Sequence, residues 1–552
     1  MSKILSLLIV ALLLNSNIYA QPKIAAKPLP ANTTTKQPKL FVGLVVDQMR
    51  WDYLYRYQNR YGNNGFNKLL KNGYSCNNTF INYTPTVTAA GHTCIYTGSV
   101  PALHGIMGNS WYNKATKKSV YCTEDSTVKT VGSYNNNGKM SPANMLATTV
   151  TDELKLATSQ KSKVVGICIK DRGSILPAGH SADAAYWYDN KTGNFITSTY
   201  YMPTLPTWVT NFNNQKNADA YYAKNWETLY PISTYTQSTD DNKLYEAKLK
   251  NATTPTFPHN LTAFIGDDYD VLPSTPYGNN ITIDMAKAAI DNMQLGKNSV
   301  TDFLAVSLSS TDYVGHKFGP NSIEVEDTYL RLDALIAEFL QYLDKTIGAN
   351  NYTLFITADH GVAHIPAYLK EHNIPSGSWD NEAMVKDLNK AITTKYGVTK
   401  AILTESNYQL YLNDNVLESV ANKQEIINFT INYCLQQNGI ANAFELKNLL
   451  TTPLQSTLRE MLNNGYNIKR SGDIQIVLEP AWIDGGSTGT THGLWNPYDS
   501  HIPMLWYGAG ITKGSSNRTM YMTDIAPTVA ALLHIQMPNT CIGTVMSEVL
   551  AK

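Results

Sequence analysis

The run KLFVGLVVD, from Lys39 to Asp47, is the stretch that decides the fold. Its apolar residues are continuous, without the alternation of a strand that has one wet face, and the run ends abruptly at a charged residue. A strand that is covered on both faces has this pattern, as in a parallel sheet between two layers of helices. The sequence therefore predicts a buried parallel strand with Asp47 at its carboxyl end.

Three further runs have the same character, and each leads to a charged residue. They are KVVGICI (163–169) before Lys170, FLAVSLS (303–309) before Asp312, and TLFIT (353–357) before Asp359. Helical patterns lie between them, beginning at Ser141-Pro142 and spanning 281–293 and 325–343. This alternation predicts an α/β protein with a largely parallel central sheet and helices on both faces.

Two long segments lack the alternating pattern. Residues from about 200 to 276 are rich in Tyr, Asn, Thr and Pro, and residues from about 376 to 480 are helical in places. We expect both to be insertions that form a cap on one catalytic domain spanning residues 39–552.

The amino terminus predicts export. Residues 1–20 combine one lysine with an apolar run and a small residue, Ala20, so we expect a signal peptide cleaved near Ala20 and a linker over residues 21–38. No second run is long enough for a stable membrane insertion. The protein is expected in the periplasm or outside the cell, where its six cysteines become candidates for disulfides.

The charge balance shows no excess of basic residues. Lys and Arg together number 44, as do Asp and Glu, so the formal net charge is zero. A nucleic-acid partner is therefore not expected.

The charged residues after the runs indicate a metal site. The carboxyl ends of parallel strands meet at one edge of a sheet, where ligands bind. There Asp312 and His316 are four residues apart, and Asp359 and His360 are adjacent; Asp47 and His492 complete a mixed set. Each residue alone is explained by capping or packing, but the set predicts two metal ions. Oxygen and nitrogen ligands suit zinc, with manganese or iron as alternatives. His92, His104, His364 and His501 are expected to support or pack around the site.

A threonine-rich stretch, 83–109, supplies a candidate nucleophile. Residues 89–96 predict a short helix with Thr88 as its N-cap. A hydroxyl at a helix amino terminus lies where an anion is favoured, which suits attack on phosphate. Thr86, two residues earlier, is the alternative.

Eight motifs spread over the chain resemble the alkaline phosphatase superfamily, and in particular its zinc-dependent bacterial phosphomonoesterases of the PafA type. They are VVDQMRWDYL, TPTVTAAGHT, TGSVPALHGIMGN, KDRGSILPAGH, DYVGHKFGP, ADHG, TTHG and TDIAPT. The resemblance implies a hydrolase with two Zn²⁺ per chain and a phosphothreonine intermediate. It assigns one zinc to Asp312, His316 and His492, and the other to Asp47, Asp359, His360 and the nucleophile Thr88. It also implies that Asn109, Lys170 and Arg172 contact the phosphoryl oxygens.

We therefore expect a secreted, monomeric alkaline phosphatase that releases inorganic phosphate from small phosphate monoesters. A phosphodiesterase or nucleotide pyrophosphatase of the same superfamily is the first alternative, but a diester has fewer charged oxygens for Lys170 and Arg172. An arylsulfatase is disfavoured because the sequence lacks the Cys-x-Pro-x-Arg or Ser-x-Pro-x-Arg motif. A secreted binding protein stabilised by metal is the alternative from another class.

Overall fold

The computed structural model describes residues 37–551 of the chain. The predicted signal peptide, residues 1–20, and nearly all of the predicted linker, residues 21–38, lie outside the described residues. None of the helices within 37–551 has both the length and the apolar character that crossing a bilayer requires.

The apolar run before Asp47 forms the central strand, β1 (Leu40–Val46). It pairs in parallel with β10 (Asp302–Leu308) on one side and with β11 (Tyr352–Thr357) on the other. Every residue of the three strands is buried. The predicted buried parallel strand is therefore confirmed, together with two of its predicted neighbours.

The sheet continues in parallel beyond β10 and becomes mixed at its edges. β7 (Val164–Cys168) and β8 (Ala184–Asp189) extend it in parallel. On the other side, β19 (Met504–Gly508) runs antiparallel to β11. Among the described residues the complete sheet has ten strands; the outer ones are β20 (Gly514–Ser516), β2 (Tyr74–Cys76), β9 (Asn194–Ser198) and β6 (Thr130–Val131).

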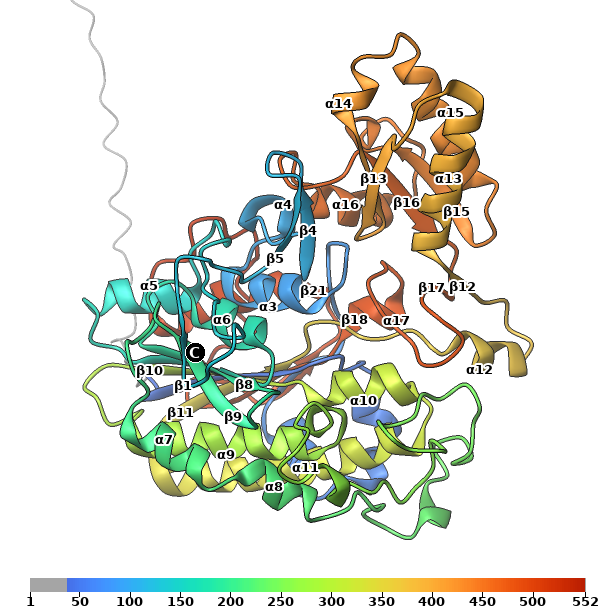
Figure 1. Cartoon of the computed structure of the whole chain (residues 1–552). Helices are drawn as coiled ribbons and strands as arrows, with labels where there is room; N and C mark the ends of the chain where they lie inside the picture. Colours follow the sequence, from blue (N-terminus) through green and yellow to red (C-terminus); the bar gives the residue numbers. More distant parts are fainter. Residues whose placement is uncertain (1–36, 552) are drawn as a thin grey trace, which may run out of the picture. The chain divides into compact units, whose positions relative to one another are not determined.

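Helices cover both faces of this sheet (Figure 1). α9 (Tyr277–Asn292) and α11 (Ile323–Leu343) lie on one face, and α3 (Thr88–Thr97) and α6 (Asp171–Ala178) lie on the other. The predicted architecture, a largely parallel sheet between two helical layers, is confirmed.

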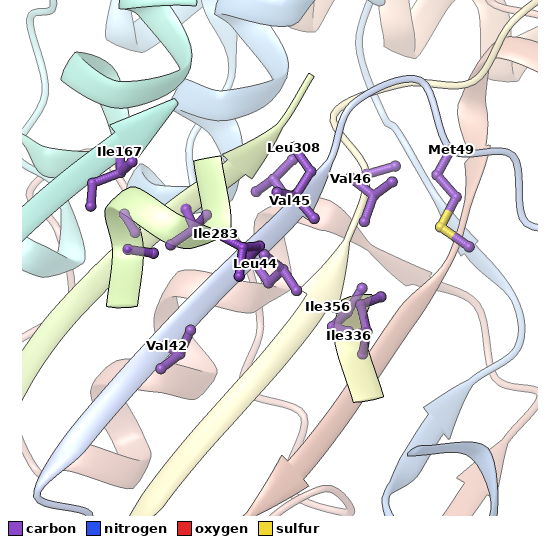
Figure 2. Packing of buried hydrophobic residues seen from close by; sticks show 14 of the residues in the cluster. Val42, Leu44, Val45, Val46, Met49, Ile167, Ile283, Leu308, Ile336 and Ile356 are labelled. Atoms are coloured by element: carbon purple, nitrogen blue, oxygen red, sulfur yellow. The ribbon is translucent and has the colours of Figure 1, made fainter. Parts of the chain in front are cut away.

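Burial on both faces explains the uninterrupted apolar sequence of β1. Figure 2 shows Leu44 and Val42 of β1 in one cluster with Ile283 of α9 and Ile336 of α11. Burying a side chain of this size contributes about 1.5–3 kcal/mol. On the opposite face α3 lies very close to β1, because a Cβ atom at Gly43 would lie 2.3 Å from the hydroxyl oxygen of Tyr96 in α3. Glycine at this position lets α3 lie directly on the central strand.

The segment 376–480 builds a second sheet with its own core. Its four strands are antiparallel, and α13 (Asn381–Tyr396) and α15 (Lys423–Leu435) pack around a cluster that includes Leu388 and Ile476. The strands, in sheet order, are β13 (Ile402–Ser406), β14 (Gln409–Leu412), β16 (Ile474–Leu478) and β15 (Ile440–Glu445). The segment 200–276 instead holds two short α-helices, α7 (Thr207–Asn214) and α8 (Asn217–Tyr222), and three single-turn 3-10 helices among irregular chain.

The helix predicted to begin at Ser141 is wrong. The helix in this region is α5 (Val150–Ala157), which Thr149 caps by accepting from the backbone N–H of Asp152. Tertiary hydrogen bonds override the local signal, because the backbone N–H of Ser141 donates to Thr123 and that of Leu146 to His104.

Two smaller predictions also need correction. Val87, and not Thr88, is the N-cap of α3, and Thr88 is its first residue. All six cysteines lie in the described part of the chain and all are free, so the expected disulfides are not formed.

Candidate active site

The predicted ligands gather at the edge where β1, β10 and β11 end. Asp47 follows β1, and Asp359 with His360 follows β11. Asp312 lies in the first turn of α10 (Ser310–Phe318), directly after β10. Because the three strands are parallel neighbours, their ends bring these side chains together.

The ligand atoms form two groups that share one histidine. One group consists of Asp47, Asp359 and His360, and the other of Asp312, His360 and His492, each with its ligand atoms within 4.8 Å of one another. The first group contains three of the four residues expected for one zinc, all except Thr88. In the second, His360 stands where His316 was expected, but His316 lies close by, with its Nε2 3.2 Å from Oδ1 of Asp312.

Three imidazoles are oriented by backbone carbonyl groups. The distance from Nδ1 to the carbonyl oxygen is 2.8 Å from His316 to Thr490, 2.9 Å from His360 to Gly361, and 2.7 Å from His492 to Thr86. A carbonyl oxygen can only accept, so each Nδ1 carries a proton, which leaves Nε2 as the nitrogen that can bind a metal ion. This is the orientation in which a histidine binds a metal ion through Nε2.

Burial and crowding shift the charges of this cluster. Burial, with the nearby carboxylate of Asp359, raises the pKa of Asp47 well above its ordinary value. Burial lowers the pKa of His360, and burial together with the neighbouring imidazoles lowers that of His492, so both rings stay neutral. Oδ1 of Asp47 is buried and accepts no hydrogen bond from the described residues.

These residues fit a divalent cation. Carboxylate oxygens and neutral imidazole nitrogens, with no thiolate among them, are the ligands of zinc in catalytic sites. The unpartnered oxygen of Asp47 and the repulsion that raises its pKa would both be relieved by a positive ion.

Lys170, directly after β7, lies between the two groups. Its ammonium donates to Oδ2 of Asp47 at 2.7 Å and to Oδ2 of Asp312 at 2.6 Å. Burial lowers the pKa of Lys170, but Asp312 and Asp47 outweigh burial and raise it, so the amine remains charged. The Nζ atom also lies 3.4 Å from Oγ1 of Thr88. In this structure Lys170 therefore neutralises carboxylates of both groups.

The hydroxyl of Thr88 faces the cluster because α3 lies close to the end of β11. At Gly91 a Cβ atom would lie 2.4 Å from the carbonyl oxygen of Asp359, so a larger residue would push the helix away. Thr88 is 1% exposed, and its Oγ1 lies 3.4 Å from Nε2 of His360.

Thr86, the alternative nucleophile, is engaged elsewhere. Its hydroxyl donates to the carbonyl oxygen of Leu494 at 2.8 Å. This contact directs the Thr86 hydroxyl to the loop that follows His492, whereas Thr88 directs its own hydroxyl to the imidazole and the ammonium.

Asn109 and Arg172 border the same region. Oδ1 of Asn109 accepts from the backbone N–H of Ala89 at 3.0 Å, which leaves its amide hydrogens for another acceptor. Arg172 donates through Nη1 to the hydroxyl of Tyr121 at 3.0 Å, and that hydroxyl donates to Oδ1 of Asp171 at 2.6 Å. Nε of Arg172 has no hydrogen-bond partner among the described residues.

A cavity of about 260 Å³ opens beside these cations. Its walls are mostly aromatic and polar, and they include Tyr121, Lys170, Arg172, Trp187, Tyr188 and Tyr313.

Two residues that the sequence analysis did not place in direct contact with the ligands touch them in the structure. Gln48 donates from Nε2 to Oδ1 of Asp312 at 2.6 Å and from its backbone N–H to Oδ1 of Asp359 at 3.1 Å. His92, expected only to support or pack, has its Nδ1 2.9 Å from the carbonyl oxygen of Thr88 and 3.2 Å from Oδ2 of Asp359. The position of Gln48 directly after Asp47 was an available signal; nothing in the spacing of His92 pointed to Asp359.

A mostly parallel sheet with carboxylates, imidazoles and a threonine hydroxyl at its strand ends defines the alkaline phosphatase-like class of hydrolases. The family model described as type I phosphodiesterase / nucleotide pyrophosphatase matches residues 41–499. The chain belongs to this family, within the superfamily of phosphodiesterases and alkaline phosphatases, and its residues and family together imply a metal cofactor.

Similar proteins cover nearly the whole chain. It is 50% identical over 541 residues to alkaline phosphatase PhoV of Synechococcus elongatus, with 98% of each chain covered. It is 53% identical over 524 residues to a Myroides odoratus protein named calcium-transporting ATPase; the matched residues make up 94% of this chain and 96% of that protein. Alkaline phosphatase PafA of Elizabethkingia meningoseptica is 49% identical over 523 residues, which make up 94% of this chain and 95% of that protein. A crystal structure of wild-type PafA matches with a TM-score of 0.91 and 48% identity, over 94% of this chain and 99% of that one.

Proposed function

We propose that the chain is an alkaline phosphatase that hydrolyses phosphate monoesters of small molecules and releases inorganic phosphate. The observation that carries this proposal is the buried hydroxyl of Thr88, placed against His360 and Lys170 where the carboxylate and imidazole ligands gather. Relatives named as alkaline phosphatases, about half identical over nearly their whole length, support the same function. The name of the Myroides odoratus relative describes a related reaction, since an ATPase also transfers a phosphoryl group to water, although from an anhydride.

We infer two Zn²⁺ per chain. Asp47, Asp359 and His360, with the hydroxyl of Thr88, would hold one ion, and Asp312, His316 and His492 the other. When bound, zinc would supply positive charge that stabilises the attacking and leaving oxygens of the reaction.

Thr88 is the proposed nucleophile. Its hydroxyl gives up its proton to water as Oγ1 forms a bond to phosphorus and the bond from phosphorus to the alcohol oxygen breaks; the alcohol leaves with the electron pair and takes up a proton from water. A water molecule then attacks the phosphothreonine, the bond from Oγ1 to phosphorus breaks, Oγ1 takes up a proton, and inorganic phosphate is released. The close approach of α3 at Gly91 holds the hydroxyl in place for both steps.

Three further residues would hold the phosphoryl oxygens. Asn109 can donate through Nδ2 because its Oδ1 is engaged by Ala89. The ammonium of Lys170 is 3.4 Å from the nucleophilic oxygen, so it lies close to any phosphoryl group bound there. Arg172 brings a second permanent positive charge and an unpartnered N–H.

These two cations favour a monoester over the diester chemistry that the family description also names. A monoester dianion has three non-bridging oxygens, whereas a diester has two and carries one negative charge less. Cations placed at the phosphoryl group therefore gain more from the monoester, and hydrogen bonds to charged groups contribute about 1.5–3 kcal/mol each.

The organisation of the chain completes the proposal. Residues 39–552 would form one catalytic domain, with insertions at about 200–276 and 376–480 that cap it, behind a signal peptide (1–20) and a linker (21–38). The enzyme would act as a monomer in the periplasm or outside the cell, with no nucleic-acid partner.

The deciding experiment compares the hydrolysis of a phosphate monoester, a phosphate diester and a sulfate ester by the purified protein. We expect the monoester to have the highest kcat/KM, the activity to disappear with a chelator, and Zn²⁺ to restore it. A higher kcat/KM for the diester would identify the phosphodiesterase alternative. No hydrolysis by metal-loaded protein, with metal content checked by elemental analysis, would favour the binding protein.

A further inference from the structure

The hairpin between β13 and β14 in the second insertion reaches the active site with its turn. The turn consists of Asn407 and Tyr408, whose φ angles are 58° and 62°. A two-residue hairpin turn with both φ angles positive favours Asn followed by Gly. Tyrosine in the second position is strained, and strained residues persist where the surrounding contacts hold them. The Tyr408 side chain therefore stands at a position where the backbone conformation favours glycine.

Asn407 holds the loop that carries Asn109. Its Nδ2 donates to the carbonyl oxygen of Ser110 at 2.8 Å, on one side of Asn109. On the other side, a Cβ atom at Gly108 would lie 2.5 Å from Oδ1 of Asn407, so the amide touches this backbone as well. The residue proposed to bind phosphate is thus fixed on both flanks by one side chain of the insertion.

Tyr408 lies against the loop that carries His492. A Cβ atom at Gly493 would lie 3.1 Å from Cε2 of Tyr408 and 3.2 Å from its hydroxyl oxygen, and Gly493 has a φ of 128°. Tyr408 is 9% exposed and stacks on Trp379, with 6.2 Å between the ring centroids. The backbone N–H of Tyr408 also donates to Oε1 of Glu405 at 2.6 Å. Contacts within the insertion therefore fix the Tyr408 ring independently of its contact with the loop of His492.

Further contacts attach the insertion to the strand that begins at Ser110, so the position of the turn is fixed. Tyr112 of β4 (Ser110–Asn113) packs against Tyr411 of β14, with ring centroids 5.5 Å apart. Lys114, just after β4, forms an ion pair with Asp473. These contacts hold the hairpin to the strand that follows Asn109.

We propose that Asn407 and Tyr408 are positioning residues for the phosphatase reaction: Asn407 orients Asn109 toward the phosphoryl group, and Tyr408 sets the loop of His492. Neither touches the reacting atoms. The inference rests on the proposed role of Asn109 in the preceding section.

The test for Asn407 is Asn407→Gly, which removes the side chain and keeps a residue suited to positive φ. We expect kcat/KM for a monoester to fall about 3- to 10-fold, the range for one hydrogen bond, while Tm stays unchanged. The matched control is Asn373→Gly, since Asn373 is an exposed asparagine with a φ of 59° away from the site. The control should leave both kcat/KM and Tm as they are.

A double-mutant cycle separates this inference from the proposed function. If Asn407 acts through Asn109, then Asn407→Gly should cause no further loss in the Asn109→Ala background. An unchanged kcat/KM for Asn109→Ala alone would show that the proposed role of Asn109 is wrong. A clear loss for Asn109→Ala, with no loss for Asn407→Gly or with two losses that multiply, would overturn the role of Asn407.

The test for Tyr408 is Tyr408→Leu, read out by metal retention. The loop of His492 would lose its support, so we expect this variant to release bound metal to a chelator faster than Asn407→Gly and the unmodified protein do. Elemental analysis of samples taken over time measures the release. Equal rates in all three proteins would overturn the role of Tyr408.

Discussion

Replacing Lys170 by methionine tests how the carboxylates of the two ligand groups are neutralised. In the structure Lys170 is 5% exposed, and its ammonium donates to Asp47 at 2.7 Å and to Asp312 at 2.6 Å. Lys170→Met keeps a side chain of similar length and removes the charge and both hydrogen bonds. Protein stripped of metal then has no cation between these carboxylates, so it should lose stability.

The size of the loss follows from the burial of the pair. Removing one partner of a buried ion pair destabilises a protein by about 3–5 kcal/mol. The entropy of unfolding is about 2.1 cal/mol/K per residue, so for a chain of this length about 1 kcal/mol corresponds to roughly 1 °C in Tm. We therefore expect metal-free Lys170→Met to melt about 3–5 °C below metal-free unmodified protein.

Thermal unfolding of metal-stripped and zinc-loaded samples checks this reasoning. Zinc would neutralise the same carboxylates, so the variant's deficit in Tm should shrink when the metal is bound. The control is Lys155→Met, because Lys155 is also buried and pairs with Asp183 at 3.0 Å, but lies in α5. It should lower Tm equally with and without zinc. An equal deficit for Lys170→Met in both samples would refute the idea that its ammonium substitutes for metal charge.

Three further predictions concern the nucleophile, the cations and a buried carboxyl group. Thr88→Ala should abolish nearly all turnover at unchanged Tm, while Thr88→Ser retains part of it; radiolabelled phosphate on Thr86 in acid-quenched enzyme would contradict the assignment. The single truncations Lys170→Ala and Arg172→Ala should each lower monoester kcat/KM about 10- to 100-fold, and the double variant should lose monoesterase more than diesterase activity; equal losses at unchanged Tm would contradict the discrimination. Burial, then the nearby Glu324, raises the pKa of Glu246 to about 10, so the folded protein keeps a proton that the unfolded chain releases above about pH 4.3. The contribution of Glu246 to stability should therefore fall as pH rises from about 4 to 10, and Glu246→Gln should raise Tm more at pH 9 than at pH 5; an equal effect at both values would contradict this reasoning.

The elements of the central sheet could be predicted because their signal is local. β1, β7, β10 and β11 are mostly apolar and are buried along their whole length, and each is followed by the polar residues that reach the ligand edge. Burial on both faces leaves few other arrangements for such runs. The same rule brought Asp47, Asp312 and Asp359 to one place without any knowledge of side-chain contacts.

Contacts between distant segments could not be predicted. The helix expected at Ser141 is replaced by a turn because partners at Thr123 and His104 hold the backbone. The role of His360 in both ligand groups depends on how the ring is turned by Gly361, which no spacing expresses. The contact of Asn407 with Ser110 joins residues that are 297 positions apart, and only the folded insertion brings them together.

The place of β1 at the middle of the sheet has a consequence for biosynthesis. β1 is the first strand to leave the ribosome, yet its partners β10 and β11 are made much later; the bond from Gln48 to Asp359 joins residues that are 311 positions apart. Until then an apolar strand with two unpaired edges is exposed to aggregation. The proposed ligand set closes later still, with His492. A chain that ends before His492 would lack part of this site, so metal loading would report that synthesis has reached the last segments of the protein.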